Sequence, residues 1–229
     1  MEKKRIPTDV FGEWVELGRD EGMAMGHQQA VDHMLELALN NRKSFSFIDA
    51  GCGNGWVVRQ VAKLPQCVSA VGIDGAQQMI EKAKTIDSKN HYTLTDLETW
   101  KPNSPVDIVH SMEVVYYLKD PFAFLRNIYN LWLTKGGVLI LGLDFYKENK
   151  VSHSWPEDCG VSIMHLFSEK HWAELFREAG FSKVESTRFG IRENWYGTLI
   201  LKGQKYIQVI KKQPPNERLF LKENDFNKC

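Results

Sequence analysis

Three glycines at alternate positions follow a short apolar run that ends in an acid, and this pattern constrains the fold more than any other feature. Residues 47–56 read FIDAGCGNGW. The run Ser46–Ile48 suits a buried strand, whereas apolar side chains recur at helical spacing from Asn54 to Leu64. The glycines therefore lie on a strand-to-helix turn, where a residue without a Cβ atom permits positive φ and close approach to a ligand.

The residues around this turn favour one class of ligand over another. The dinucleotide fingerprint requires a small residue at the sixth position, but counting from Gly51 places Trp56 there, and counting from Gly53 places Val58 there. Asp49 precedes the turn, and its charge disfavours a phosphate and attracts a cation, because a partly buried carboxylate is weakly screened. The turn therefore predicts a site for a small ligand with a cationic group.

The stretch Asp49–Gly55 resembles the first motif of the class I S-adenosylmethionine-dependent methyltransferases. Later segments resemble the later motifs of that family in the right order, and they occupy residues 70–80, 92–97, 106–111 and 135–141. The resemblance extends from about residue 45 to residue 202. It implies an α/β, Rossmann-like doubly wound, mostly parallel seven-stranded sheet with helices on both faces. It also implies S-adenosyl-L-methionine as cofactor and S-adenosyl-L-homocysteine as product.

The resemblance assigns expected roles to individual residues of the cofactor half. It implies that Asp74 binds the ribose hydroxyls, that Met79 packs on the adenine, and that Asp96 accepts a hydrogen bond from the adenine amino group. The alternative for both acids is a helix N-cap, a place that acids favour. For Cys52, a small side chain in a crowded turn is expected rather than a nucleophile. The other expected cofactor-binding residues are Asp49, Gly51, Cys52, Gly53, Asn54, Gly55, Gly75, Leu97 and Ser111.

The chain departs from the family pattern at three places. Ala76 stands where a serine is frequent, Lys135 where a proline is frequent, and Tyr116-Tyr117 where a His-His pair is frequent. Only the tyrosine pair bears on the substrate.

The N-terminal segment is rich in aromatic, charged and glycine residues. Gly12, Gly18, Gly22 and Gly26 argue against one continuous helix there, and a helix is expected only from about His27 to Asn40. We expect this segment to form a cap over the cofactor, in which Arg19 binds the cofactor carboxylate in a bidentate way. The alternative for Arg19 is a solvated surface side chain. The other expected cap residues are Phe11, Trp14 and residues 21–25.

The rest of the pattern predicts three parts: a cap segment and helix (1–40), a methyltransferase domain (41–205) and a polar tail (206–229). Strands and helices alternate from Phe45 to Leu141, as in a parallel sheet with right-handed crossovers. Pro121 is expected to begin one helix, and Ser168 to cap another. Residues 183–189 and 195–202 are expected to form two closing antiparallel strands.

Composition excludes several classes of protein. The 29 basic and 29 acidic residues cancel, which argues against a broad nucleic-acid surface. The four cysteines are far apart, and the histidines show no metal-ligand spacing, so the sequence predicts neither a disulfide framework nor a metal site. We expect a cytoplasmic protein without a signal peptide or membrane span, and oligomeric state is not indicated.

The acceptor site is expected beyond the carboxyl ends of the strands, between the first strand and the fourth. The catalytic candidates there are Glu113, Tyr117 and Asp144, with His110 and His153 as further proton acceptors. Ordinary packing is an equal alternative for all of them except His110, for which packing or a hydrogen bond at a strand end is the favoured interpretation. The prediction is in-line methyl transfer to a nitrogen or oxygen of a small molecule. Alternatives are a catalytically silent cofactor-binding subunit, a methyltransferase of a protein or RNA group, and an aminopropyl transferase.

Overall fold

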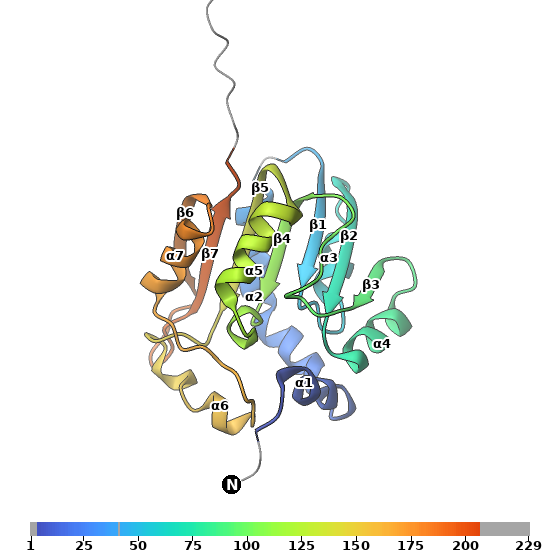
Figure 1. Ribbon diagram of the computed structural model, residues 1–229. Helices are drawn as coiled ribbons and strands as arrows, with labels where there is room; N and C mark the ends of the chain where they lie inside the picture. Colours follow the sequence, from blue (N-terminus) through green and yellow to red (C-terminus); the bar gives the residue numbers. More distant parts are fainter. Residues whose placement is uncertain (1–3, 41, 207–229) are drawn as a thin grey trace, which may run out of the picture.

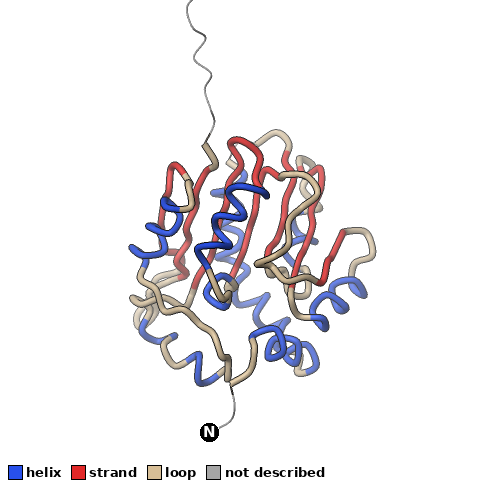
Figure 2. Tube along the Cα trace, viewed as in Figure 1, coloured by secondary structure: helices blue, strands red, loops and turns tan. Residues whose placement is uncertain are grey.

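The computed structural model describes residues 4–40 and 42–206, and its centre is a seven-stranded sheet with helices packed around it (Figures 1 and 2). The strand order is β3-β2-β1-β4-β5-β7-β6. The predicted doubly wound α/β fold is confirmed. The strands are β1 (Phe45–Ala50), β2 (Cys67–Asp74), β3 (His91–Leu94), β4 (Val106–Met112), β5 (Leu133–Leu143), β6 (Ser182–Phe189) and β7 (Thr198–Gln204).

Strands β1 to β5 are parallel, and β7 is antiparallel to both of its neighbours. The predicted antiparallel finish is therefore confirmed. The last strand begins at Thr198 rather than at Trp195, because Trp195 and Arg192 exchange backbone hydrogen bonds of 3.0 Å in a turn. The order in which successive strands are added to the sheet reverses between β1 and β4, and the connections that leave the carboxyl ends of these two strands diverge and form a crevice.

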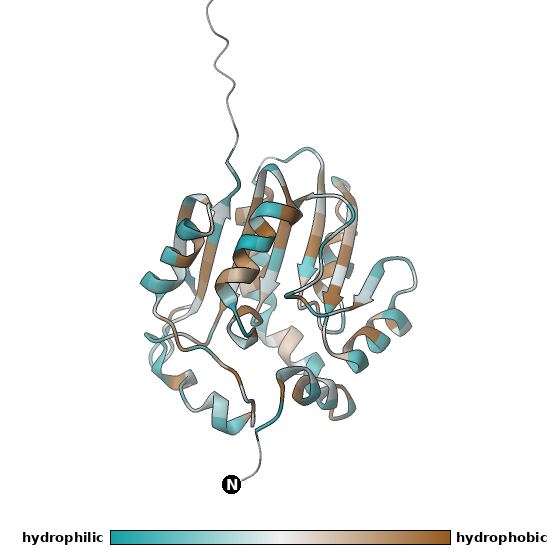
Figure 3. Cartoon of the chain, in the orientation of Figure 1, coloured by the Kyte–Doolittle hydropathy of each residue, from teal (hydrophilic) through white to brown (hydrophobic). Residues whose placement is uncertain are grey.

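Helices cover both faces of the sheet, and their apolar sides meet the strands (Figure 3). Val31 and Met34 pack with Phe47 on one face, whereas Phe124 and Trp132 pack with Val109 on the other. One face carries α2 (Arg19–Leu39), α3 (Trp56–Val61) and α4 (Gln77–Ile86). The other carries α5 (Pro121–Asn127), η2 (Ile128–Trp132) and α7 (Glu169–Glu178). The remaining elements are α1 (Pro7–Glu16), η1 (Val115–Tyr117), η3 (Lys150–Ser152) and α6 (Trp155–Asp158).

The ends of the later helices follow their sequence signals. Asp120 caps α5 by accepting a hydrogen bond of 2.9 Å from the Ala123 amide, and Pro121 is the first helical residue. Ser168 caps α7 through the His171 amide at 3.1 Å. Helix α3 is shorter than predicted, because Gly55 still belongs to the preceding turn.

The N-terminal segment is more helical than predicted. Helices α1 and α2 are separated only by a short turn at Gly18, where φ is 66°. Helix α2 therefore begins at Arg19 rather than near His27. It passes through Gly22 and Gly26, although each glycine costs a helix about 1 kcal/mol relative to alanine. Packing of the following turns against the sheet offsets this cost. Most of the predicted polar tail, from residue 207 onward, lies outside the described residues.

Candidate active site

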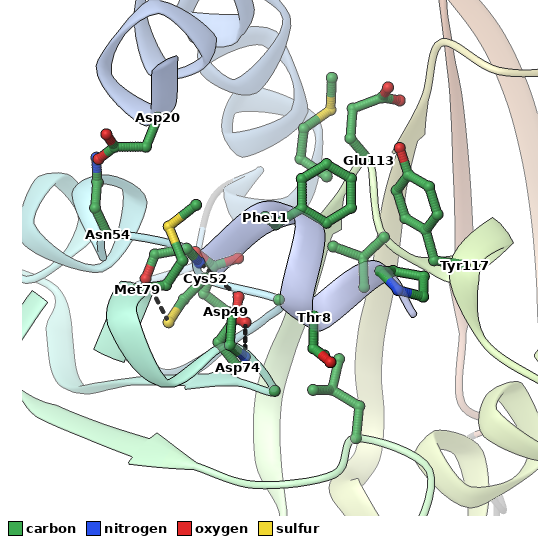
Figure 4. Close-up of a pocket in the computed structure, with 18 of the residues that line it drawn as sticks. Thr8, Phe11, Asp20, Asp49, Cys52, Asn54, Asp74, Met79, Glu113 and Tyr117 are labelled. Carbon is green, nitrogen blue, oxygen red and sulfur yellow. Dashed lines mark hydrogen bonds between the residues drawn. The ribbon is translucent and has the colours of Figure 1, made fainter. Parts of the chain in front are cut away.

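A cavity of about 780 Å³ lies at the carboxyl ends of β1, β2 and β4, beneath helix α1 (Figure 4). Figure 4 shows Cys52, Asp74 and Met79 on one side of α1, with Glu113 and Tyr117 on the other. The structure thus brings together most of the residues predicted for cofactor and acceptor. The predicted residues that line the cavity are Asp49, Gly51, Cys52, Gly53, Asn54, Asp74, Gly75, Met79, Asp96, Leu97, Glu113 and Tyr117, with His110 from the further proton acceptors.

The glycine turn has the backbone that its sequence predicts. Gly51, Gly53 and Gly55 have φ values of 81°, 52° and 79°, in the left-handed region that favours glycine. A Cβ atom on Gly51 would lie 2.2 Å from Val114, and one on Gly55 would lie 2.4 Å from Tyr92. At Gly53 the nearest atom is 3.8 Å away. Gly51 and Gly55 therefore allow Val114 and Tyr92 to pack against the turn, whereas Gly53 leaves open space on the cavity side.

Asp74 joins the end of β2 to the glycine turn. Its carboxylate accepts hydrogen bonds from the Gly53 amide at 2.9 Å and the Ala76 amide at 2.8 Å. Burial raises the pKa of Asp74, and these two hydrogen bonds oppose that rise. Because Ala76 is the N-cap of α4, Asp74 is not a simple helix cap. Asp96 is exposed in the cavity wall and accepts a bond of 2.9 Å from the Glu98 amide.

A polar contact that the sequence did not reveal joins α2 to Asn54 in the glycine turn. Asp20, only 4% exposed, accepts hydrogen bonds from the Asn54 amide nitrogen Nδ2 at 2.8 Å and from Lys82 Nζ at 3.0 Å. Both Asp20 and Asn54 line the cavity. The sequence analysis predicted the neighbouring residue Arg19 as the site residue of this segment, whereas Asp20 is the one that lines the cavity.

Asp49 and His110 form a buried pair on neighbouring strands beneath the cavity. The distance from Asp49 Oδ1 to His110 Nδ1 is 2.7 Å, and both side chains are almost fully buried. The second ring nitrogen, Nε2, has no hydrogen-bond partner among the described residues. His110 also stacks on Phe47, with ring centroids 6.0 Å apart.

Glu113 is held in an unusual conformation directly after β4. Its φ of 59° lies in the left-handed region, which costs a non-glycine residue roughly 1 kcal/mol or more. The carboxylate accepts a bond from the Tyr116 hydroxyl at 2.5 Å and another from the Asp144 amide. Burial and the nearby charge of Asp144 raise the pKa of Glu113 to about 8. The backbone and two donors thus fix this carboxylate at the cavity wall.

His27, which was not among the predicted site residues, completes this group from α2. Its Nε2 atom lies 3.3 Å from Asp144 Oδ2, and its ring also hydrogen bonds to the backbone of Met23. Burial lowers the pKa of His27, but the hydrogen bond to Asp144 and the charge of Glu113 raise it by more, so the net shift is upward. His27, Glu113 and Asp144 place one possible ligand atom each within 4.8 Å of the others.

Several predicted residues are not among those that line the cavity. The Ser111 hydroxyl donates to the Ala50 carbonyl at 2.7 Å and lies within the sheet. The Arg19 guanidinium is 5.8 Å from the Trp14 ring centroid, and Arg19 is exposed. His153 is exposed and contacts the Lys147 carbonyl at 3.1 Å. Gly55 and Asp144 lie just behind the cavity wall and support residues that face it.

Helix α1 covers the cavity. Phe11 lies edge-on to Tyr117, with ring centroids 4.9 Å apart, and Thr8 packs so closely on Gly75 that a Cβ there would be 2.7 Å from it. Of the predicted cap residues, Phe11, Met23 and Ala24 line the cavity, whereas Glu21, Gly22 and Met25 are not among the lining residues. Trp14 does not line the cavity, but its ring packs against Phe11 with ring centroids 4.9 Å apart.

The strand order, the glycine turn after β1 and the acid that ends β2 define the class I methyltransferase fold. The family model described as "Methyltransferase domain" matches residues 23–186, and the chain belongs to this family. The cofactor of this class is S-adenosyl-L-methionine.

Two curated relatives show how far the sequence similarity extends. A ubiquinone biosynthesis O-methyltransferase from Pelagibacter ubique is 30% identical over 43% of this chain and 42% of its own length. A trans-aconitate 2-methyltransferase from Azoarcus sp. is 30% identical over 41% of this chain and 37% of its own length. The match thus spans about two fifths of each relative.

Two solved structures share the fold. One is a chain from the complex between the Haloferax volcanii Trm112 methyltransferase activator and a candidate methyltransferase, with a TM-score of 0.77 and 24% identity over 90% of this chain and 100% of that chain. The other is the N-methyltransferase NodS from Bradyrhizobium japonicum with S-adenosyl-L-homocysteine, with a TM-score of 0.63 and 18% identity over 78% of this chain and 86% of that chain. No helix among the described residues is both long and apolar enough to cross a membrane.

Proposed function

We propose that this protein transfers the methyl group of S-adenosyl-L-methionine to a nitrogen or oxygen atom of a small molecule. The observation that carries the proposal is one continuous cavity with two unlike ends. One end is the glycine turn with Asp74 and Met79, and the other is the group around Glu113 and Tyr117. Its volume of about 780 Å³ falls in the range of sites that enclose a small ligand.

The cofactor is assigned to the glycine-turn end. Gly53 leaves room for a ligand against the backbone, and Asp74 stands beside it as the acceptor for the ribose hydroxyls. Met79 and Leu97 supply apolar contacts for the adenine, and Asp96 is exposed next to them. The carboxylates of Asp49 and Asp20 suit the cationic amino-acid part of the cofactor.

The acceptor is assigned to the end formed by Phe11, Tyr117, His27 and Glu113. Methyl transfer needs alignment and exclusion of water more than it needs a strong base, because the sulfonium already activates the methyl group. The aromatic rings of Phe11 and Tyr117 supply an apolar wall. Glu113 and His27 supply polar groups that can orient the acceptor's N–H or O–H.

A small acceptor is favoured over a protein or RNA group by the position of α1. This helix covers the cavity and packs against α4 through Gly12, where an added Cβ would lie 2.4 Å from Gln78. A macromolecular acceptor would have to displace this contact. The two curated relatives above are named for small acceptors, which is consistent with this assignment.

Isotope transfer from labelled cofactor into a metabolite mixture tests the proposal. The expected result is one labelled small molecule, with loss of labelling in Asp74→Ala. Calorimetry should show binding of S-adenosyl-L-methionine and its demethylated product and none of NAD. A Trm112-type protein is added in a parallel reaction, because the H. volcanii structure contains one.

Three other outcomes would redirect the proposal. Binding without transfer to any fraction, with or without the added protein, supports a catalytically silent subunit. Label in protein or RNA alone supports a macromolecular acceptor, and preference for decarboxylated cofactor supports an aminopropyl transferase.

A further inference from the structure

We propose that His27, Glu113 and Asp144 form a binding site for one divalent transition-metal cation at the acceptor end of the cavity. The three side chains come from α2 and from the ends of β4 and β5, so only the folded chain assembles them. They offer one imidazole nitrogen and two carboxylates, with ligand atoms within 4.8 Å of one another. His27 and Glu113 also line the cavity.

The spacing between His27 and Asp144 fits a shared cation. Nitrogen and oxygen ligands lie about 2.1 Å from ions such as Zn²⁺, so two neighbouring ligands of one ion are about 3.0–3.4 Å apart. The observed distance from His27 Nε2 to Asp144 Oδ2 is 3.3 Å. The backbone of Met23 also interacts with the His27 ring, and contacts of this kind orient a metal-binding imidazole.

A second observation is independent of this spacing. Asp144 is only 4% exposed, and its Oδ1 atom has no hydrogen-bond partner among the described residues. A buried carboxylate oxygen without a donor is costly, because it has lost water without gaining a protein partner. A cation between Asp144 and Glu113 would supply the missing interaction and would balance two neighbouring carboxylates.

The ligand set indicates the class of cation. Imidazole suits Fe²⁺ and Zn²⁺, and carboxylates suit Mn²⁺. Three protein ligands would leave further coordination positions open beside the cavity, which His27 and Glu113 line. The role of this cation in catalysis rests on the proposed function. An acceptor oxygen or nitrogen that binds the cation at an open coordination position would lose its proton to solvent more readily. Its lone pair then forms the bond to the methyl carbon, and the carbon–sulfur bond breaks with its electrons returning to sulfur.

Titration of the metal-free full-length chain with Mn²⁺, without cofactor, tests the site directly. Electron paramagnetic resonance should show one bound Mn²⁺ per chain, and pulsed spectra should show coupling to one imidazole nitrogen. Zn²⁺ should compete for the same site. His27→Gln should abolish the nitrogen coupling and weaken Mn²⁺ binding at least tenfold.

His33→Gln is the matched control, because His33 lies on the same helix but is not among the cavity-lining residues and stacks on Phe189 at 5.0 Å. It should keep the nitrogen coupling. Circular dichroism verifies that each variant folds, and Asp144→Asn gives a second loss-of-ligand variant should His27→Gln not fold. No Mn²⁺ or Zn²⁺ binding by the parent, or nitrogen coupling that survives His27→Gln, would overturn the site. Metal binding without methyl transfer would overturn the proposed function and leave the site standing.

Discussion

Asp49 and His110 face each other across two adjacent parallel strands, and a distance of 2.7 Å joins Oδ1 of the acid to Nδ1 of the imidazole. The register of β1 and β4 places the two residues opposite each other directly below the glycine turn. Asp49 is 2% exposed, so its carboxylate depends on this partner more than on water. The pair connects the stability of the central sheet with the floor of the cofactor site.

His110→Ala should therefore destabilise the fold and weaken cofactor binding together. Removal of one partner leaves a buried acceptor unsatisfied, at a cost of about 1–3 kcal/mol, and the lost ring leaves a cavity beside Phe47. Urea unfolding measures the first effect, and calorimetry with S-adenosyl-L-homocysteine measures the second. A variant with parental unfolding free energy would show that the pair does not stabilise the sheet.

Asp74→Ala should weaken binding of S-adenosyl-L-homocysteine by about 1–3 kcal/mol, the scale for loss of a charged hydrogen-bond acceptor. The substitution should also lower the unfolding free energy, because the Gly53 and Ala76 amides lose their hydrogen-bond acceptor. Asp74→Asn keeps one acceptor oxygen and separates these effects. Because the two amides donate to different oxygens, it should recover only part of the stability and little of the affinity, as measured by urea unfolding and calorimetry. Parental affinity in both variants contradicts the ribose assignment.

Two glycine substitutions should have opposite effects. Gly53→Ala places a Cβ at φ of 52° on the cavity side of the turn, so it should lower both stability and cofactor affinity. Gly26→Ala lies within α2 with no atom near the added Cβ, so it should raise the unfolding free energy by about 0.5–1 kcal/mol. Thermal unfolding with and without S-adenosyl-L-homocysteine checks both. Destabilisation by Gly26→Ala would show that α2 needs a flexible residue beside His27.

The pH dependence of stability should include a contribution from Asp87. Burial opposes ionisation, but hydrogen bonds from Asn90, the Lys89 amide and Tyr92 hold its pKa at about 2, below the ordinary value of 3.8. The folded state therefore binds fewer protons than the unfolded state between these values, and the stabilisation is present above pH 4 and lost as the pH falls to 2. Urea unfolding at pH 5 and pH 3 should show a larger loss for the parent than for Asp87→Asn. Equal losses would contradict this assignment.

The sequence predicted those parts of the molecule that local patterns determine. The alternation of strands and helices defined the sheet. The glycine turn has positive φ at all three positions, and nearby packing admits no Cβ at Gly51 and Gly55. The caps at Asp120 and Ser168 also follow from local chemistry. In these regions local preference and tertiary packing agree.

The parts that were missed depend on contacts between distant segments. His27 meets Asp144 only after α2 packs across the sheet, and no spacing along the chain indicates that pair. The start of α2 was missed because burial of the helix against β5 and β7 outweighs the low helix propensity of its glycines. Asp20 rather than Arg19 lines the cavity because the rotation of α2, which its packing sets, turns residue 20 inward.

Hydrogen exchange in helix α1 should slow when the cofactor binds. It lines the cavity through Thr8 and Phe11, yet its N-cap Ile6 forms no side-chain cap bond. It contacts Tyr117 on one side of the cavity through Phe11, and Gly75 and Gln78 on the other side through Thr8 and Gly12. A ligand that binds beneath α1 and contacts only its closed form raises the free energy of its local opening, so its protection from exchange increases. Hydrogen exchange should show slower exchange over residues 7–16 and 19–25 when S-adenosyl-L-homocysteine is present. Phe11→Ala should reduce that protection while leaving protection at Gly51–Gly55. Unchanged exchange over α1, with clear protection at the glycine turn, would show that α1 is a fixed wall rather than a lid.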